Sequence, residues 1–154
     1  MTINYAGVLI YKKENNKLKI LVSENKGRFE DIGTQIDNDI LSLAYHIEKE
    51  TNEQIKSINI IDRLKLAPYI YFPKYNYIIY FIEASKDEKI LKRDDFSEHS
   101  FYNGSIRYIG WMPRDKLFSS STLKYKINHR LQSKSIINKI IDIEKQYKYK
   151  HKMF

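Results

Sequence analysis

The 154-residue chain has no cysteine and no long apolar run. The lack of cysteine excludes disulfide bonds, thiolate zinc sites and a cysteine nucleophile, so packing alone must hold the fold together. No stretch approaches the ~18 consecutive apolar residues of a membrane-spanning helix. The N-terminal sequence runs directly into a strand pattern, without the basic region and cleavage site of a secretion signal. We therefore expect a soluble, intracellular protein, cytoplasmic or nuclear, with no membrane partner.

Several motifs that would define a function or divide the chain are also missing. The phosphate-binding pattern G-x-x-x-x-G-K-[ST] does not occur, and the serine-rich run at 119–122 has no nucleophile signature. There is no internal repeat and no long linker. With 42% hydrophobic and 30% charged residues, a chain of this length can bury one core. We expect a single domain spanning residues 1–154.

The charge is strongly positive and unevenly distributed. The net charge is +8, the chain contains thirteen tyrosines, and basic residues far outnumber acidic ones after Trp111. This combination favours partners that carry phosphates or stacking bases, including RNA. The same composition also arises when an AT-rich genome enriches Lys, Asn, Ile and Tyr, so charge alone leaves the partner open.

Hydrophobic periodicity predicts a mixed fold of strands and helices. Aliphatic runs on either side of a turn predict a hairpin, and beyond Asp39 the apolar spacing changes to that of a helix capped by one of three N-cap candidates. Two helices flanking a mixed sheet make an α+β or layered α/β/α domain. The expected elements are strands at 5–11, 18–24, 57–72, 75–85 and 106–112, a helix from 39 to about 51, a short turn or helix at 115–118 and a closing helix at 133–150.

The order of these elements and four short motifs resemble the Nudix hydrolases across most of the chain. The motifs are "AGVLIY" in the hairpin, "FEDIG" before the first helix, "EKETN" at that helix's end and "IGWMPRDKL" after the later strands. The resemblance implies a Nudix-like α/β/α sandwich with a mixed central sheet and two principal helices. In that family the box G-x5-E-x7-R-E-U-x-E-E-x-G-U, with U aliphatic, forms a loop and helix that hold magnesium against a pyrophosphate.

Several positions of this box carry different residues here. When "ETN" is taken as its end, Glu50 occupies the last acidic position and Lys49 the acidic position before it. Asn52 then stands at the glycine, His46 at the first glutamate of the helix and Tyr45 at the arginine.

Upstream of the helix, the loop of the box is about one residue short. Gly33 matches one of its two opening glycines, Thr34 replaces the other, and Asp37 or Asp39 stands near the upstream glutamate. By resemblance, Glu50 is the best metal ligand, and Asp37, Asp39 or Glu53 would assist it.

The replaced residues predict weakened or lost catalysis. Magnesium prefers several hard oxygen ligands, which a helix supplies only from positions three or four apart. The imidazole of His46 is a poor magnesium ligand, and the ammonium of Lys49 repels a cation. Tyr45 also lacks the guanidinium that orients a carboxylate of the box in the family. If activity persists, Glu50 and Glu53 are the catalytic candidates, with Mg²⁺ or Mn²⁺ as the cofactor.

Two other interpretations of this helix stay open. His46 and Glu50, with Asp37 or Asp39, would form a mixed nitrogen and oxygen site suited to manganese, zinc or iron. Alternatively, His46, Glu50 and Glu53 are the solvated face of an amphipathic helix, with Lys49 and Glu53 as an ordinary ion pair.

Residues outside the box are candidates for ligand binding. Tyr69 and Tyr71 would present rings to a base, and Lys74 a charge to a phosphate. Arg130 and Lys134 would contact phosphates before the closing helix. The alternative is that the tyrosines are ordinary strand residues and the cations are solvated.

Three functions follow from these patterns. The first is a Nudix-like protein that binds a nucleoside diphosphate-linked ligand or an RNA 5′ end and has weakened or lost pyrophosphohydrolase activity. The second is an active metal-dependent hydrolase, in which the metal activates water. The third is a non-catalytic scaffold for a protein partner.

Overall fold

The computed structural model describes residues 3–100, 106–119 and 126–152, and places the side chains of residues 3–97, 106–119 and 127–147. The strands are β1 (Tyr5–Glu14), β2 (Lys17–Asn25), β3 (Arg28–Glu30), β4 (Ile32–Gln35), β5 (Tyr69–Phe72), β6 (Tyr77–Glu83), β7 (Glu98–Ser100), β8 (Ile106–Pro113) and β9 (Lys126–Ile127). The helices are α1 (Ile40–Glu50), α2 (Ser57–Leu66), the 3₁₀ turn η1 (Pro73–Tyr75), α3 (Lys86–Lys89), α4 (Arg93–Phe96), α5 (Arg114–Phe118) and α6 (Lys134–Lys152).

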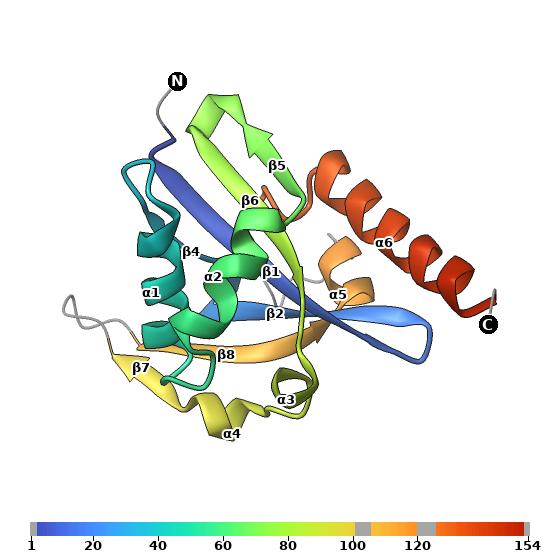
Figure 1. Ribbon diagram of the computed structural model, residues 1–154, viewed down its shortest axis with the longest axis horizontal. Coiled ribbons are helices and arrows are strands. Elements are labelled where there is room, and N and C mark those ends of the chain that lie inside the picture. The colour runs from blue at the N-terminus through green and yellow to red at the C-terminus, as the bar shows by residue number, and fades with distance from the viewer. Residues whose placement is uncertain (1–2, 101–105, 120–125, 153–154) are drawn as a thin grey trace.

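All of these strands belong to one mixed sheet (Figure 1). Its main order is β5-β6-β1-β2-β3-β9, with β4 paired to β1, β8 to β2 and β7 to β8. The pairs β1–β6 and β3–β9 are parallel and the others antiparallel. The mixed α/β fold predicted from the sequence is therefore confirmed.

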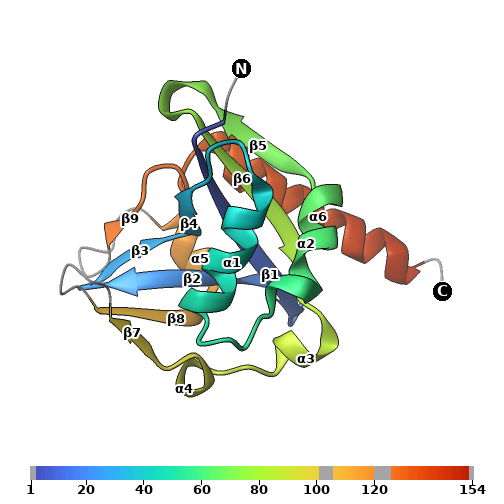
Figure 2. The same cartoon turned by 60° about the vertical axis from the view of Figure 1, so that its left-hand side comes forward.

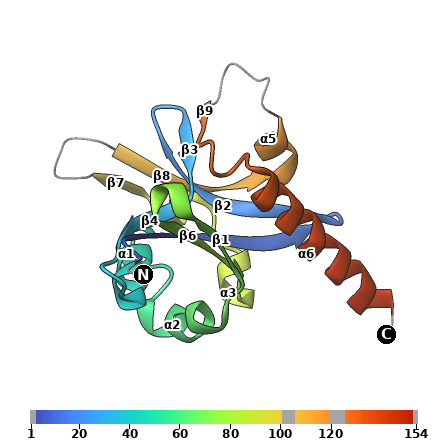
Figure 3. The same ribbon diagram turned by 90° about the horizontal axis from the view of Figure 1, so that it is seen from above.

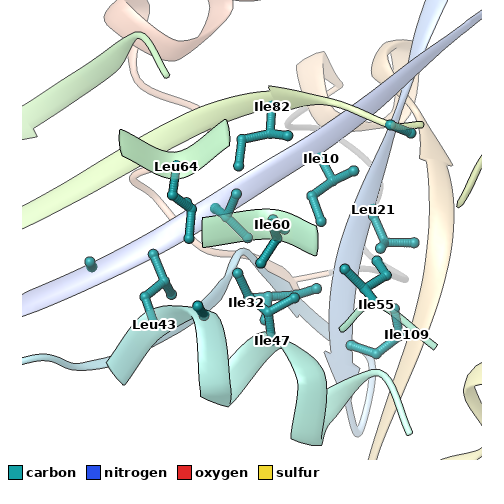
Figure 4. Packing of buried hydrophobic residues seen from close by; sticks show 14 of the residues in the cluster. Ile10, Leu21, Ile32, Leu43, Ile47, Ile55, Ile60, Leu64, Ile82 and Ile109 are labelled. Atoms are coloured by element: carbon teal, nitrogen blue, oxygen red, sulfur yellow. The ribbon is translucent and has the colours of Figure 1, made fainter. Parts of the chain in front are cut away.

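Helices cover both faces of the sheet and create two apolar cores. Figure 3 shows α1 and α2 on one side and α5 and α6 on the other. The first core lies between the sheet and the α1–α2 pair, where residues such as Ile32, Ile47 and Ile60 converge (Figure 4). The second joins Leu9 and Ile79 of the sheet to residues of α5 and α6. Within the described residues, no helix is long and apolar enough to cross a membrane.

The predicted hairpin, first helix and closing helix are confirmed. Strands β1 and β2 pair through a turn in which Asn15 and Asn16 have positive φ, as a tight hairpin turn requires. Asp39 caps α1 by accepting a hydrogen bond from the amide of Leu41 at 2.9 Å. Helix α6 buries residues at helical spacing, among them Ile136 and Ile140.

The strand predicted at residues 57–72 is wrong for its first ten residues, which form α2. Its β-branched composition favoured a strand. Tertiary packing decided otherwise, because Ile60 and Leu64, four residues apart, are both fully buried against α1 and the sheet. Ile58 and Leu66, at 80% and 88% exposure, point to solvent. The fold thus has three long helices rather than the two predicted, with α2 beside α1 in Figure 2.

Helix α2 is also tied to the segment that follows β6. The guanidinium of Arg63 donates to both carboxylate oxygens of Glu88, at 2.9 and 2.5 Å, and to the carbonyl of Glu83 at 3.0 Å. The Glu88 side chain is only 7% exposed, so its charge depends on this partner. Glu88 also completes a capping box with Ser85 at the start of α3.

Replacing Arg63 with alanine should lower the free energy of unfolding by about 2 kcal/mol, because it leaves a buried carboxylate without its cation. Urea denaturation monitored by circular dichroism measures the change. Lys56→Ala is the matched control, since its pair with Glu53 is 4.0 Å long and exposed. An equal loss in both variants would show that Arg63 contributes no more than a surface charge.

Candidate functional site

The sheet divides where the chain passes from β3 to β4. Along one edge of β1, residues Tyr5–Val8 pair with β4, whereas residues Ile10–Glu14 pair with β2. The consecutive strands β3 and β4 therefore have different partners, β2 and β1. Asp31 is the single residue between them, and it is 3% exposed. A carboxyl group is thus buried at the point where the sheet splits.

Two residues from distant parts of the sequence contact this carboxyl group. The hydroxyl of Tyr77, on β6, donates to Asp31 Oδ2 at 2.5 Å. The guanidinium of Arg130, in the turn before α6, lies 3.5 Å from Asp31 Oδ1 and 4.0 Å from the centre of the Tyr77 ring. The three side chains thus connect the β3–β4 junction to strand β6 and to the segment before α6.

Two glycines make room for the Asp31–Tyr77 contact. Gly7 and Gly33 are directly opposite each other on β1 and β4. A Cβ atom on Gly7 would stand 1.6 Å from Asp31 Oδ2, and one on Gly33 would stand 2.0 Å from the Tyr77 hydroxyl. Any other residue at either position would occupy the space that the buried pair needs.

Burial raises the pKa of both Asp31 and Tyr77. Loss of water raises the pKa of Asp31, although the Tyr77 hydrogen bond and the charge of Arg130 both act to lower it. Burial and the nearby Asp31 carboxylate raise the pKa of Tyr77, so the phenol stays neutral and donates its proton. Burial and the two partners of Asp31 therefore act on its pKa in opposite directions.

Glu50 takes part in a second buried polar contact, at the end of α1. It is 2% exposed, although the sequence predicted that Glu50 is a metal ligand or part of a solvated helix face. The hydroxyl of Ser23 donates to Glu50 Oε1 at 2.9 Å, and His46 Nε2 lies 2.5 Å from Oε2. The carboxylate thus stands between the hydroxyl and the imidazole. This order does not activate a serine nucleophile, because the Ser23 hydroxyl contacts Glu50 and not a histidine base.

These contacts surround a pocket of about 260 Å³, here called the central pocket. A neighbouring hollow of about 540 Å³, the outer pocket, shares Glu30 and Arg107 with it. The two adjacent pockets are together called the cleft. The central pocket is lined by Tyr5, Glu30, Asp31, Gly33, Thr34, Gln35, His46, Glu50, Tyr77, Arg107 and Arg130. The outer pocket is lined by Asn25, Arg28, Phe29, Glu30, Arg107, Ile127, Asn128 and His129.

Each carboxylate of the central pocket has a basic partner. Glu30 pairs with Arg107, Asp31 with Arg130 and Glu50 with His46. In the part of the chain that the structure describes, no group of three or more His, Cys, Asp or Glu residues is placed to hold a metal ion. Magnesium needs several oxygen ligands, which these paired carboxylates do not supply.

The structure separates the predicted metal ligands. Asp39 caps α1 and Asp37 accepts a hydrogen bond from Gln35 at 3.3 Å, both before the first turn of that helix. His46 and Glu50 lie near the other end, and an eleven-residue helix is about 16 Å long. The expected set of Asp37 or Asp39 with His46 and Glu50 is therefore not brought together by the fold.

Glu53 does not continue the helical face of His46 and Glu50, because α1 ends at Glu50. Asn52 and Glu53 have φ values of 56° and 62°, which terminate the helix in a left-handed turn. The Glu53 side chain is 73% exposed, and its nearest cation, at 4.0 Å, is Lys56 rather than the expected Lys49.

Among the predicted ligand-binding residues, Arg130 lines the cleft and the other four lie outside it. Tyr69 packs edge-on against Tyr80, with ring centres 6.0 Å apart, and Tyr71 donates to Asn76 at 3.3 Å. Lys74 lies beside the ring of Tyr75, and Lys134 is exposed at the start of α6. Their role in binding stays a prediction.

Sequence patterns missed Asp31, Glu30 and Arg107, which line the central pocket together with Arg130. Asp31 did carry a recognisable sign, because it is a charged residue inside "FEDIG", between two strand-forming segments. Tyr77 also lines the pocket and is one of the tyrosines around the turn at 69–80 that are candidates for stacking on a base, but no local pattern predicted its buried contact with Asp31.

Comparisons with known proteins add no family. No protein-family model matches the chain. No curated protein is significantly similar to it. The resemblance to Nudix hydrolases therefore stays a prediction from the quoted motifs.

Replacing Gly33 with alanine should lower stability by about 2 kcal/mol, because the new methyl group would collide with the Tyr77 hydroxyl. Removing that hydroxyl in Tyr77→Phe should recover part of the loss. A double-mutant cycle from urea denaturation measures the coupling between the two positions. Additive effects would show that Gly33 is not required by the buried pair.

The stability of the wild type relative to Asp31→Asn should fall as pH rises above about 4. An acid whose pKa is raised by folding stabilises the folded state below its unfolded pKa, and this contribution is lost as pH rises through the folded pKa. Urea denaturation of both proteins between pH 4 and 8 gives this difference. A difference that rises with pH would mean that Arg130 and Tyr77 outweigh burial.

Proposed function

We propose that this protein binds a nucleoside diphosphate-type ligand in the cleft formed by the central and outer pockets and does not hydrolyse it. The observation that carries the proposal is the pairing of every carboxylate of the central pocket with a basic group, two of which are arginines, beside an exposed tyrosine ring. Such a lining offers cations and a stacking surface but no set of metal ligands.

Arg130 is the first group that fits a phosphate. Its distance to Asp31, 3.5 Å, is longer than the ~2.7–2.9 Å of a strong charge-assisted hydrogen bond, and its buried Nε atom has no hydrogen-bond partner. A phosphate oxygen would give Arg130 the charged acceptor that Asp31 supplies incompletely.

The cleft also provides a surface for a base. Tyr5 and Tyr77 are stacked, with ring centres 6.4 Å apart and planes at 5°. Tyr77 is buried, whereas Tyr5 is 43% exposed and lines the central pocket. A base can stack on the outer face of the Tyr5 ring, an interaction that tolerates different bases.

The local structure at the end of α1 adds support. Asn52, which occupies the glycine position of the resemblance to the Nudix box, has the left-handed φ of 56°. Asparagine tolerates this conformation better than most other residues. The backbone turn is therefore present at this position, whereas the acidic side chains of the central pocket are paired with basic groups. Metal activation of water, which the hydrolytic reaction requires, has no ligand set here.

Arg130→Gln should weaken the binding of ADP or another nucleoside diphosphate about tenfold or more, because it removes the incompletely paired guanidinium. Isothermal titration calorimetry measures the affinity, which should also fall with added salt. Lys65→Gln is the matched control, since Lys65 is exposed on α2, away from the cleft. Equal affinities in Arg130→Gln and the wild type would remove Arg130 from the site.

A phosphate-release assay with Mg²⁺ or Mn²⁺ tests the absence of hydrolysis. The substrates are a panel of nucleoside diphosphate derivatives and capped RNA, and we expect no metal-dependent turnover from the wild type. Turnover that is lost in Glu50→Gln would overturn the proposal, because it would show that the paired carboxylates still assemble a metal site.

A further inference from the structure

A second pocket, on the opposite edge of β2, is built around Gly110. This β8 pocket has a volume of about 260 Å³ and is lined by residues of β8, by Arg93 of α4 and by Lys116 of α5. It shares no residue with the central pocket and one residue, Phe29, with the outer pocket. Its lining residues are Val22, Glu24, Phe29, Arg93, Tyr108, Ile109, Gly110, Trp111, Met112, Pro113 and Lys116.

Neither a left-handed backbone nor crowding by neighbouring atoms requires a glycine at position 110. Its φ is not in the left-handed region, where glycine is favoured. Among the residues that the structure describes, none has an atom within 4 Å of a Cβ built on Gly110, in contrast to Gly7 and Gly33, which are crowded by the buried Asp31–Tyr77 pair. Glycine inside a strand weakens it and often marks a place where a ligand approaches the backbone closely.

Apolar side chains form the floor of the β8 pocket. Gly110 is directly opposite Val22 on β2, and Met112 is on the same sheet face two residues further. Val22 and Met112 are 2% and 5% exposed. The rings of Phe29 and Tyr108 also line the pocket. Because Gly110 has no side chain, a planar group can lie directly on the backbone between these neighbours.

Arg93 is the basic group at the rim of the β8 pocket. It lies 4.3 Å from the centre of the Tyr108 ring, and its side chain is 59% exposed. Its ion pair with Glu24 is long, at 3.5 Å. An anionic substituent beside Arg93 would give the guanidinium a second charged acceptor.

We infer that the β8 pocket is a second binding site, which takes a flat aromatic ring carrying an anionic group. The ring lies on Gly110 between Val22, Tyr108 and Met112, and the anionic group faces Arg93. The volume is just below the ~300 Å³ at which pockets for drug-sized ligands begin, which fits a small ring system rather than a whole dinucleotide. This site does not depend on the function proposed for the central pocket.

Gly110→Val tests the inference with anilinonaphthalene sulfonate, a fluorescent aromatic anion, as the probe. The valine fills the space over the strand, so the affinity of the probe should fall about tenfold or more. The thermal midpoint should stay the same or rise, because valine is a better strand residue than glycine. A loosened fold would bind more of this dye, so a loss of binding at preserved stability cannot arise from unfolding.

Three further variants locate the probe. Arg93→Gln should weaken binding about threefold and reduce its dependence on salt. Leu66→Gln, which removes an apolar side chain that is 88% exposed on α2, should leave binding unchanged. Lys65→Gln should also leave it unchanged, since Lys65 is exposed on α2 and lines neither pocket. A probe lost in Leu66→Gln or Lys65→Gln but kept in Gly110→Val would overturn the inference.

If Gly110→Val does not fold, the amide chemical shifts of the wild-type protein test whether the probe binds in the β8 pocket. Addition of the probe should shift the amide resonances of Gly110, Val22 and Tyr108. Shifts confined to residues outside the β8 pocket would overturn the inference.

Discussion

The buried contact between Asp31 and Tyr77 is the constraint on which the rest of the site depends. The sheet splits where β3 ends and β4 begins, and a carboxyl group there would be costly unless it were hydrogen-bonded. The Tyr77 hydroxyl supplies that bond, and Arg130 adds a cation from the C-terminal segment. One contact therefore joins both halves of the split sheet to the turn before α6.

The Asp31–Tyr77 contact requires residues without side chains at two neighbouring positions. Gly7 and Gly33 face each other on adjacent strands, and neither needs the left-handed backbone that glycine permits. They are required because their missing side chains leave space for Asp31 and Tyr77. Gly110 differs from both, since the space above it is empty of protein atoms. The space beside Gly7 and Gly33 is thus occupied by Asp31 and Tyr77, whereas no described side chain occupies the space beside Gly110.

Pairing of charges decides what chemistry the cleft supports. Glu30, Asp31 and Glu50 would together offer six carboxylate oxygens, but each residue has a basic partner. A metal ion would have to displace these partners. Arg130 has the longest of the three ion pairs, at 3.5 Å. We therefore propose that the cleft holds a phosphate and does not activate water.

The sequence by itself determined the mixed α/β class, the hairpin, the Asp39 cap of α1 and the buried face of α6, because each depends on neighbours within a few residues. It misassigned α2, whose β-branched residues favour a strand until α1 and the sheet bury Ile60 and Leu64. Only the tertiary structure decided that Glu50 turns inward, that Glu53 lies beyond the helix, and that Asp31, Tyr77 and Arg130 meet. These contacts join residues 27 to 99 positions apart, and local periodicity carries no information about such distances.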